Sequence, residues 1–287
     1  MADIQKTLYF YRIIAEPSLF VNGNDMDSKM YEVFKKIFIK GKGTYDIKPK
    51  NKKDSIFRFD IIDFNNEYIF GTFGKTDQRS DPLVRVRETQ SNKTEPFELP
   101  LGKILEHFTF YLIDFKHRIL CLLNNKKVGK LPTELKKFAE LQQQQLSILP
   151  VVVENLKDML SLWHHFSKLE FCYSEEYQKK CGYKLPSELS NMDENIGKYT
   201  CMLSFKKDNQ ITAQSLADIP TSKFRYCKVS GTERNGNDER ENITLDLVEK
   251  TFTRSLKIDI SDSYEENLRT VKETLLNGIH NMLTNCP

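Results

Sequence analysis

The sequence contains little of what marks several large classes of protein. Of its 287 residues, 12 are glycine and 10 are proline, too few for a collagen-like or Pro/Gly-rich low-complexity chain. The longest nearly apolar run covers residues 146–153, much shorter than the roughly 20 residues that a membrane-spanning helix needs. The first six residues have neither the basic start nor the apolar stretch of a secretory signal. We therefore expect a globular protein without a membrane span.

Cysteine is also scarce, and its spacing fits no zinc or redox motif. The six cysteines include no C-x-x-C pair. A chain of this length can build its own hydrophobic core and does not need disulfides for stability. We expect reduced cysteines that fill small apolar spaces, and a cytoplasmic protein. The cysteines are Cys121, Cys172, Cys181, Cys201, Cys227 and Cys286.

Signatures of catalysis are missing as well. The sequence has no H-E-x-x-H, no P-loop G-x-x-x-x-G-K-[ST] and no G-x-S-x-G. His164 and His165 fall in a predicted helix, where consecutive side chains point about 100° apart and cannot share a ligand. Asp63 and Asp114 lie where turns commonly place aspartate. We expect no enzyme, no metal and no cofactor, with a cryptic metal-dependent nuclease built from scattered carboxylates as an alternative.

The N-terminal half shows the periodicities of strands and of one helix. Residues 7–14 are predicted to form a strand. Apolar residues at three- and four-residue steps predict a helix over 27–40, which Gly41 is expected to end. The apolar face of this helix consists of Met30, Val33, Phe34, Ile37 and Phe38.

Two segments in this half resemble each other. Residues 57–64 (FRFDIIDF) and 108–115 (FTFYLIDF) share five of eight residues. Each continues through a short polar stretch into a second apolar run, the pattern of a β-hairpin. The similarity fits an internal repeat, or two amphipathic hairpins that converged by chance. Glycines 71 and 74 follow the first turn and are expected at a bend or a bulge.

The C-terminal half alternates helices and strands. Predicted helices cover residues 133–141, 154–166, 174–181, 186–196 and 262–283. Predicted strands cover residues 146–153, 169–173, 199–206, 224–230, 242–247 and 255–260. The apolar stripe of the last helix fits packing on a sheet or, alternatively, a dimer contact.

These elements predict an α+β fold of antiparallel, hairpin-built sheets with packed helices in two lobes. We expect a basic, hairpin-rich N-terminal domain over residues 1–145. An α+β C-terminal domain with the terminal amphipathic helix should cover residues 146–287.

Charge is distributed unevenly between these halves. The chain has 43 basic and 40 acidic residues, a net charge of +3. Residues 1–143 hold 25 basic and 19 acidic residues, whereas the remainder holds 18 and 21. Residues 29–58 alone hold ten basic and three acidic residues, and residues 116–137 hold seven and one. The small net charge is thus a cancellation between a basic half and an acidic half.

Nucleic acid is the partner that such basic clusters most plainly favour, because phosphate contacts release counterions and need no sequence code. Arg85 and Arg87 lie one strand period apart and are expected on the same face. Solvated surface is the alternative, since lysine-rich loops are common. The candidate contacts are Lys35, Lys36, Lys40, Lys42, Lys48, Lys50, Lys52, Lys53, Arg85, Arg87, Lys116, Arg118, Lys126, Lys127 and Lys130.

The order of features adds a resemblance to known proteins. Hairpins containing YIFGTF (68–73) and CLLNNKK (121–127) precede the ILPVVV segment (148–153), KVSGTERNG (228–236) and a terminal helix. This pattern resembles bacterial phage-exclusion proteins such as the A component of the prophage Rex system, and is similar to the B component of Kiwa-type defence. The resemblance implies a cytoplasmic, homodimeric protein that binds double-stranded DNA in abortive infection. A protein-interaction module that meets an acidic partner from a defence operon, without nucleic acid, is the alternative.

Overall fold

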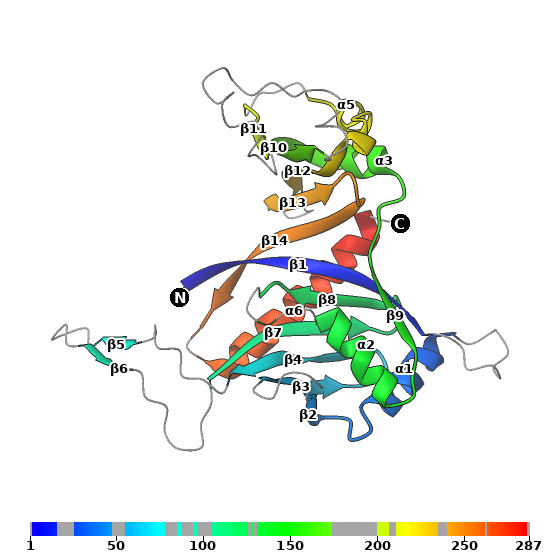
Figure 1. Cartoon of the computed structure of the whole chain (residues 1–287), viewed down its shortest axis with the longest axis vertical. Helices are drawn as coiled ribbons and strands as arrows, with labels where there is room; N and C mark the ends of the chain where they lie inside the picture. Colours follow the sequence, from blue (N-terminus) through cyan, green and yellow to red (C-terminus); the bar gives the residue numbers. More distant parts are fainter. Residues whose placement is uncertain are drawn as a thin grey trace, which may run out of the picture. The chain divides into compact units, whose positions relative to one another are not determined.

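The fold is mixed α+β and dominated by antiparallel strands, which confirms the predicted fold class (Figure 1). Hydrogen bonds link the strands in the order β11-β10-β12-β13-β14-β1-β8-β7-β4-β3-β2, while β9 pairs with β1 and β5 pairs with β6 in a separate ribbon. The computed structural model describes residues 2–15, 26–47, 55–77, 85–87, 94–96, 105–125, 128, 131–173, 200–206, 211–234, 240–261 and 263–285.

Two compact units can be distinguished. The hairpin unit comprises residues 11–149 and 271–275, and the C-terminal unit comprises residues 1–10, 150–270 and 276–287. Strand β1 (Ala2–Ala15) and helix α6 (Tyr264–Asn285) contribute residues to both units. The division into domains at residues 145 and 146 stays a prediction.

The hairpin unit is built from the two hairpins that the sequence predicts. Strand β4 pairs with β3 on one side and with β7 on the other, so that the two hairpins form one antiparallel sheet. Besides its parts of β1 and α6, the described residues of this unit also form two helices, a ribbon and two further strands. In chain order the elements are α1 (Met26–Ile37), β2 (Gly43–Ile47), β3 (Ser55–Phe64), β4 (Tyr68–Asp77), β5 (Arg85–Arg87), β6 (Thr94–Pro96), β7 (Leu105–Asp114), β8 (Ile119–Leu123), α2 (Leu131–Leu141) and β9 (Leu146–Pro150).

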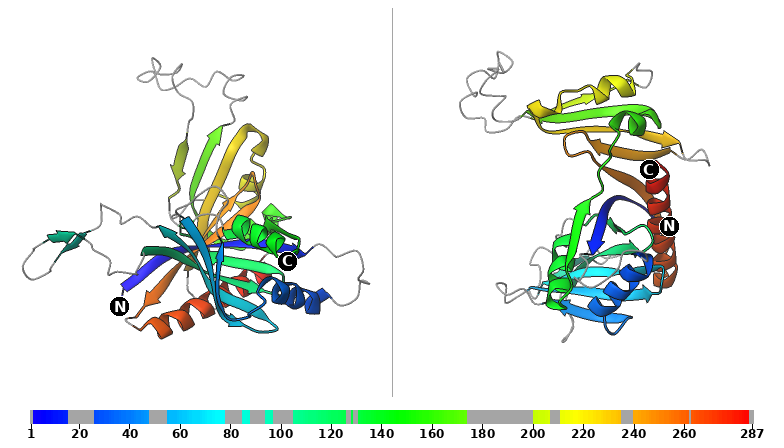
Figure 2. Two further views of the ribbon diagram at one scale, coloured as in Figure 1. Left: turned by 60° about the horizontal axis from the view of Figure 1, so that its bottom comes forward. Right: turned by 90° about the vertical axis from the view of Figure 1, so that its right-hand side faces the viewer.

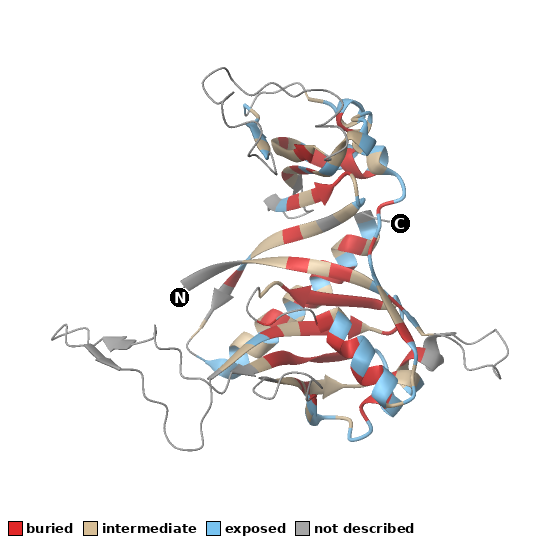
Figure 3. Ribbon diagram, in the orientation of Figure 1, coloured by how far each residue is buried: buried red, intermediate tan, exposed pale blue. Residues whose placement is uncertain are grey.

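Helices α1 and α2 cover one face of this sheet (Figures 1 and 2). The ring of Phe38 follows α1 and packs against Phe59 of β3 at 5.9 Å and against Phe138 of α2 at 5.5 Å. All three rings are buried. Figure 3 shows buried stretches along the strands of this unit. Burying each such ring contributes about 1.5–3 kcal/mol to folding. The predicted helix face is confirmed: four of its residues are buried and Val33 is half-buried.

Glycine ends the first helix, as predicted. Gly41 has a φ of +65°, and its N–H donates to the carbonyl of Phe38 at 2.8 Å. This left-handed backbone costs a glycine little, because it has no Cβ atom.

A bulge in β3 changes which residues face the helices. Phe59 and Ile61 point toward α1 and α2, while Arg58 and Asp60 point to the opposite face. The pairing shifts between Ile61 and Asp63, so the alternation is reset and Asp63 also points away from the helices. The predicted bulge therefore lies on β3, opposite Gly71. A Cβ atom at Gly71 would overlap the backbone oxygen of Asp60, which requires glycine there.

The C-terminal unit alternates long strands with short helices. Its predicted strands are confirmed, with β10, β12 and β14 longer than expected. The elements are α3 (Leu156–Ser161), β10 (Trp163–Tyr173), β11 (Cys201–Ser204), α5 (Ala213–Ala217), a 3-10 helix (Thr221–Lys223), β12 (Phe224–Arg234), β13 (Arg240–Asp246) and β14 (Thr251–Ile260). The helices expected at 174–181 and 186–196 lie outside the described residues.

The helix expected over 154–166 is wrong beyond Ser161. Trp163 and Phe166 are buried against each other, with ring centroids 5.7 Å apart, and β10 pairs with β12 along its length. The local sequence pattern of these residues favours a helix, but their pairing with the distant strand β12 decides that they form a strand. His164 and His165 are consequently neighbours on a strand, where the pairing of β10 with β12 shifts between Trp163 and His165.

The apolar stripe of α6 is largely buried within the chain. Val271, Leu275, Ile279 and Met282 are at most 5% exposed, while Tyr264 is exposed. No helix among the described residues is long and apolar enough to cross a membrane. The four described cysteines are free thiols, and three of them are buried, as expected of small apolar fillers.

Candidate functional site

The two hairpin turns lie against each other at one end of the sheet. The N–H of Phe115, which follows β7, donates to the carbonyl of Glu67 in the β3–β4 turn at 2.9 Å. Asn65 fixes that turn, since its Oδ1 accepts hydrogen bonds from the N–H groups of Glu67 and Tyr68. Asp114 fixes the other turn by accepting from the N–H of His117 at 2.8 Å, so its predicted turn role is confirmed.

Helix α1 is anchored over these turns by aromatic rings. The Tyr31 ring lies 5.6 Å from that of Phe64 and 6.1 Å from that of Phe115, which are matching residues of the two similar segments. The ammonium group of Lys35 lies 5.7 Å from the centre of the Tyr31 ring. A predicted basic residue of α1 is therefore held beside both turns.

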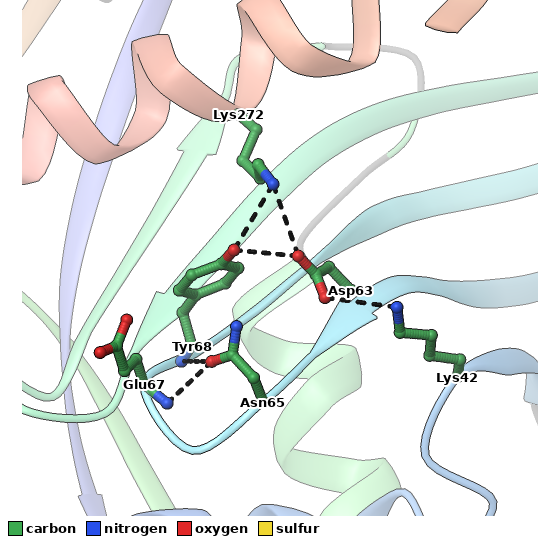
Figure 4. Close-up of polar contacts among 6 residues, drawn as sticks. All are labelled: Lys42, Asp63, Asn65, Glu67, Tyr68 and Lys272. Carbon is green, nitrogen blue, oxygen red and sulfur yellow. Dashed lines mark hydrogen bonds and ion pairs between the residues drawn. The ribbon is translucent and has the colours of Figure 1, made fainter.

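Four residues from three distant parts of the chain meet at this end, and we call them the Asp63 cluster (Figure 4). Tyr68 donates its hydroxyl hydrogen bond to Asp63 at 2.9 Å. The ammonium of Lys42 lies 3.4 Å from one oxygen of Asp63, and that of Lys272 lies 3.5 Å from the other and from the Tyr68 hydroxyl. Lys42 comes from the turn after α1, and Lys272 comes from α6. The prediction that Asp63 is a turn residue is wrong, because the bulge places it in this cluster.

The charges of the cluster stabilise one another. Burial raises the pKa of Asp63, but the Tyr68 hydrogen bond and the charges of Lys42 and Lys272 outweigh it, and the pKa is lower than usual. Burial lowers the pKa of Lys272, but its contacts with Tyr68 and Asp63 outweigh burial and raise it. All the ionisable partners of Tyr68 thus carry full charge at neutral pH.

The structure places the predicted basic residues in different surroundings. Lys35 and Lys36 on α1, Lys40 and Lys42 in the following turn and Lys116 in the β7–β8 turn are exposed. Arg118 is half-buried with a φ of +57°, and its carbonyl accepts from Ile13. Arg85 and Arg87 lie on β5 in the separate ribbon. Lys48, Lys50, Lys52, Lys53, Lys126, Lys127 and Lys130 lie outside the described residues.

Sequence reasoning missed Lys272 and Tyr68. Lys272 is 209 residues from Asp63 and lies on a helix whose only sequence signal is its apolar stripe. Tyr68 begins an apolar run in the sequence, and this pattern does not indicate that its hydroxyl group contacts a carboxylate.

A second charged group lies on the same face of the sheet. Arg58 donates to Asp46 at 2.8 Å, and Thr44 donates to Asp60 at 2.6 Å. One oxygen of Glu106 is buried with no hydrogen-bond partner among the described residues. Burial raises the pKa of Glu106 above its usual value; Arg58 opposes this rise, and the neighbouring aspartates add to it. No group of three or more described His, Cys, Asp or Glu residues is arranged to hold a metal ion.

No protein-family model matches the chain, and no curated protein shows significant similarity to it.

Proposed function

We propose that the chain binds double-stranded DNA, without strong sequence preference, through the lysines at the turn end of the hairpin unit. One observation carries the proposal: α1, anchored by Tyr31 on Phe64 and Phe115, places exposed lysines beside the linked hairpin turns. Exposed ammonium groups on long side chains are suited to phosphate oxygens and supply sequence-tolerant affinity.

Acidic groups at this end leave the lysines available to a partner. Asp63 contacts Lys42, Lys272 and Tyr68, and Asp114 contacts His117. Lys36, Lys40 and Lys116 are exposed, and no carboxylate among the described residues lies within ion-pair distance of them. Their charge is thus directed to solvent, where an acidic polymer can meet it.

The biological setting is a further part of the proposal. The resemblance to phage-exclusion proteins supports a cytoplasmic homodimer that acts on DNA in a bacterial abortive-infection system.

Fluorescence anisotropy with a labelled duplex tests the DNA proposal. A variant with Lys35, Lys36, Lys40 and Lys116 changed to Glu should bind much more weakly. The slope of log K against log salt should shrink by about 3–4, since each lost phosphate contact removes about 0.9. The matched control changes four exposed lysines of the C-terminal unit, Lys157, Lys206, Lys250 and Lys257, to Glu. Equal affinity of the two variants, or no binding by the wild type at low salt, would overturn the proposal.

One observation favours the protein-interaction alternative. Ile39 lies between Lys36 and Lys40 in the turn after α1 and is 74% exposed. Phosphate contacts do not need an apolar side chain, whereas an acidic protein partner with an apolar pocket would bury it. Under this alternative, an Ile39→Asp variant should lose a partner that co-purifies with the wild type and should bind DNA no differently.

A further inference from the structure

The Asp63 cluster contains more hydrogen-bond donors than its own acceptor can use. Each lysine ammonium has three N–H groups, and the Tyr68 hydroxyl adds one more. Asp63 is the only acidic side chain of the cluster, and its two oxygens already contact all three partners. Neither Lys42 nor Lys272 has another contact with an acidic side chain among the described residues. Several donors therefore point to an oxygen-rich anion from outside the cluster.

The two ion pairs of the cluster have long N···O distances. Their N···O distances of 3.4 and 3.5 Å exceed the roughly 2.7–2.9 Å of a close charge-assisted hydrogen bond. Both lysines can thus rotate toward a second acceptor without breaking a short bond. The Tyr68–Asp63 hydrogen bond, at 2.9 Å, is the one close contact.

Solvent reaches the cluster from the side of Lys42. The side chain of Lys42 is 64% exposed, that of Lys272 is 30% exposed and that of Asp63 is 25% exposed. An anion that approaches Lys42 meets an ammonium group held on one oxygen of Asp63, with Lys272 on the other oxygen and with Tyr68 keeping Asp63 in place (Figure 4). The cation–ring contact between Lys272 and Tyr68, at 5.7 Å, limits the positions available to that ammonium.

We propose that Lys42 and Lys272 together bind one phosphate group, and that Asp63 is their partner when no phosphate is bound. This inference rests on the proposed DNA binding and adds Lys272 as a contact to it. The phosphate takes over the outward N–H groups of both lysines, while Asp63 keeps its hydrogen bond from Tyr68. The negative charge of Asp63 repels the incoming phosphate, so Asp63 weakens binding and a neutral residue there should strengthen it.

The sign of that effect separates the proposal from a purely structural role. If Asp63 only held the lysines in place, Asp63→Asn would leave affinity unchanged or reduce it. If Asp63 competes with phosphate, Asp63→Asn raises the affinity for a labelled duplex at low salt. One recovered phosphate contact should also make the affinity fall about threefold more steeply between 50 and 200 mM salt. Lys272→Gln should lower the affinity and reduce the salt slope by about 0.9, and Lys272→Arg should retain binding.

Lys168 and Glu170 of the C-terminal unit provide a matched control. Their ion pair measures 3.3 Å, with side chains 35% and 27% exposed, close to the values of Lys272 and Asp63. Lys168→Gln and Glu170→Gln should not change DNA affinity. Should Lys272→Gln fail to fold by circular dichroism, Lys42→Gln takes its place, because Lys42 is more exposed.

The outcomes distinguish this inference from the proposed function. If the wild type does not bind the duplex, both fail. If binding depends on Lys35, Lys36, Lys40 and Lys116 but not on Asp63 or Lys272, only the phosphate subsite is overturned. Inorganic phosphate at constant ionic strength identifies the source: competition that Lys272→Gln abolishes shows a site for any phosphate, and Lys272 dependence without competition shows a site for the DNA backbone.

Discussion

Lys272 lies 3.5 Å from Asp63, although 209 residues separate them in the chain. The contact joins α6 to the bulged end of β3, beside the turn that carries Tyr68. Both charges are only partly exposed, so each influences the protonation of the other. The same contact bears on the stability of the fold as well as on the proposed phosphate binding.

The stability of the fold should depend on Asp63 in a pH-dependent way. Because its pKa is below the ordinary value of 3.8, ionised Asp63 stabilises the fold at neutral pH, and this is lost as the pH falls through the lowered pKa. Asp63→Asn should therefore unfold at lower urea concentration at pH 7, by less than about 1 kcal/mol because solvent screens the cluster. The difference should shrink in acid; a constant difference from pH 7 to pH 2 would contradict the assignment.

Glu106 should have the opposite effect. Its pKa is raised mainly by burial, so its ionised form destabilises the fold, and stability is gained as the pH falls through the raised pKa. Glu106→Gln should thus melt higher than the wild type at pH 7, by about 2–4 °C if the change is worth about 1 kcal/mol. At a pH low enough to protonate Glu106 the two melting temperatures should converge. An equal or lower melting temperature for the variant at pH 7 would show that the buried oxygen has a partner in solution.

The side chain of Phe38 is expected to contribute strongly to the stability of the hairpin unit. Its ring contacts Tyr45, Phe59 and Phe138, and the residue is fully buried. Phe38→Ala should cost about 3–5 kcal/mol in urea denaturation, because it leaves a cavity where three elements meet. Phe108→Ala, at a ring that is 41% exposed on the opposite face, is the control and should cost much less. A similar loss in the free energy of unfolding for both variants would contradict the central position of Phe38 in the core.

The thiols should differ in reactivity according to burial. Burial raises the pKa of Cys121 well above its usual value, and burial with the charge of Asp246 raises that of Cys227 to about 11. In a Cys181→Ser/Cys286→Ser background, a disulfide reagent at pH 8 should label the half-buried Cys201 first. Cys121, Cys172 and Cys227 should react only when the protein unfolds. Rapid labelling of more than one thiol in the native protein would contradict this burial pattern.

Most elements follow from local patterns in the sequence. The α1 stripe at three- and four-residue steps predicts a helix that buries Met30, Phe34, Ile37 and Phe38, because that spacing fixes one helix face. The alternation of the two similar segments predicts hairpins, since a strand places every second side chain on the same face. The excess of basic residues in the N-terminal half can also be predicted, because charge is counted directly from the sequence.

Pairing between distant strands decided the remaining elements. Residues 163–166 continue a helical pattern, yet they form a strand because β10 pairs with β12, some sixty residues later. Contacts of that range leave no periodic trace in the sequence.

Phe57 and Phe108 show that the local sequence does not determine which face of the sheet a side chain occupies. They occupy the same position of two segments that share five of eight residues, and composition and alternation treat them alike. The ring of Phe57 stacks on Phe73 on the face covered by helices, whereas Phe108 contacts Phe110 on the opposite face. Local sequence determined two β-hairpins, one amphipathic helix and a basic N-terminal half, since each depends on neighbouring residues. Only the tertiary structure decided that β3 bulges after Ile61, because the bulge depends on the pairing of β3 with β4. The bulge changes the face of the sheet on which the following side chains lie and places Asp63 beside Lys272.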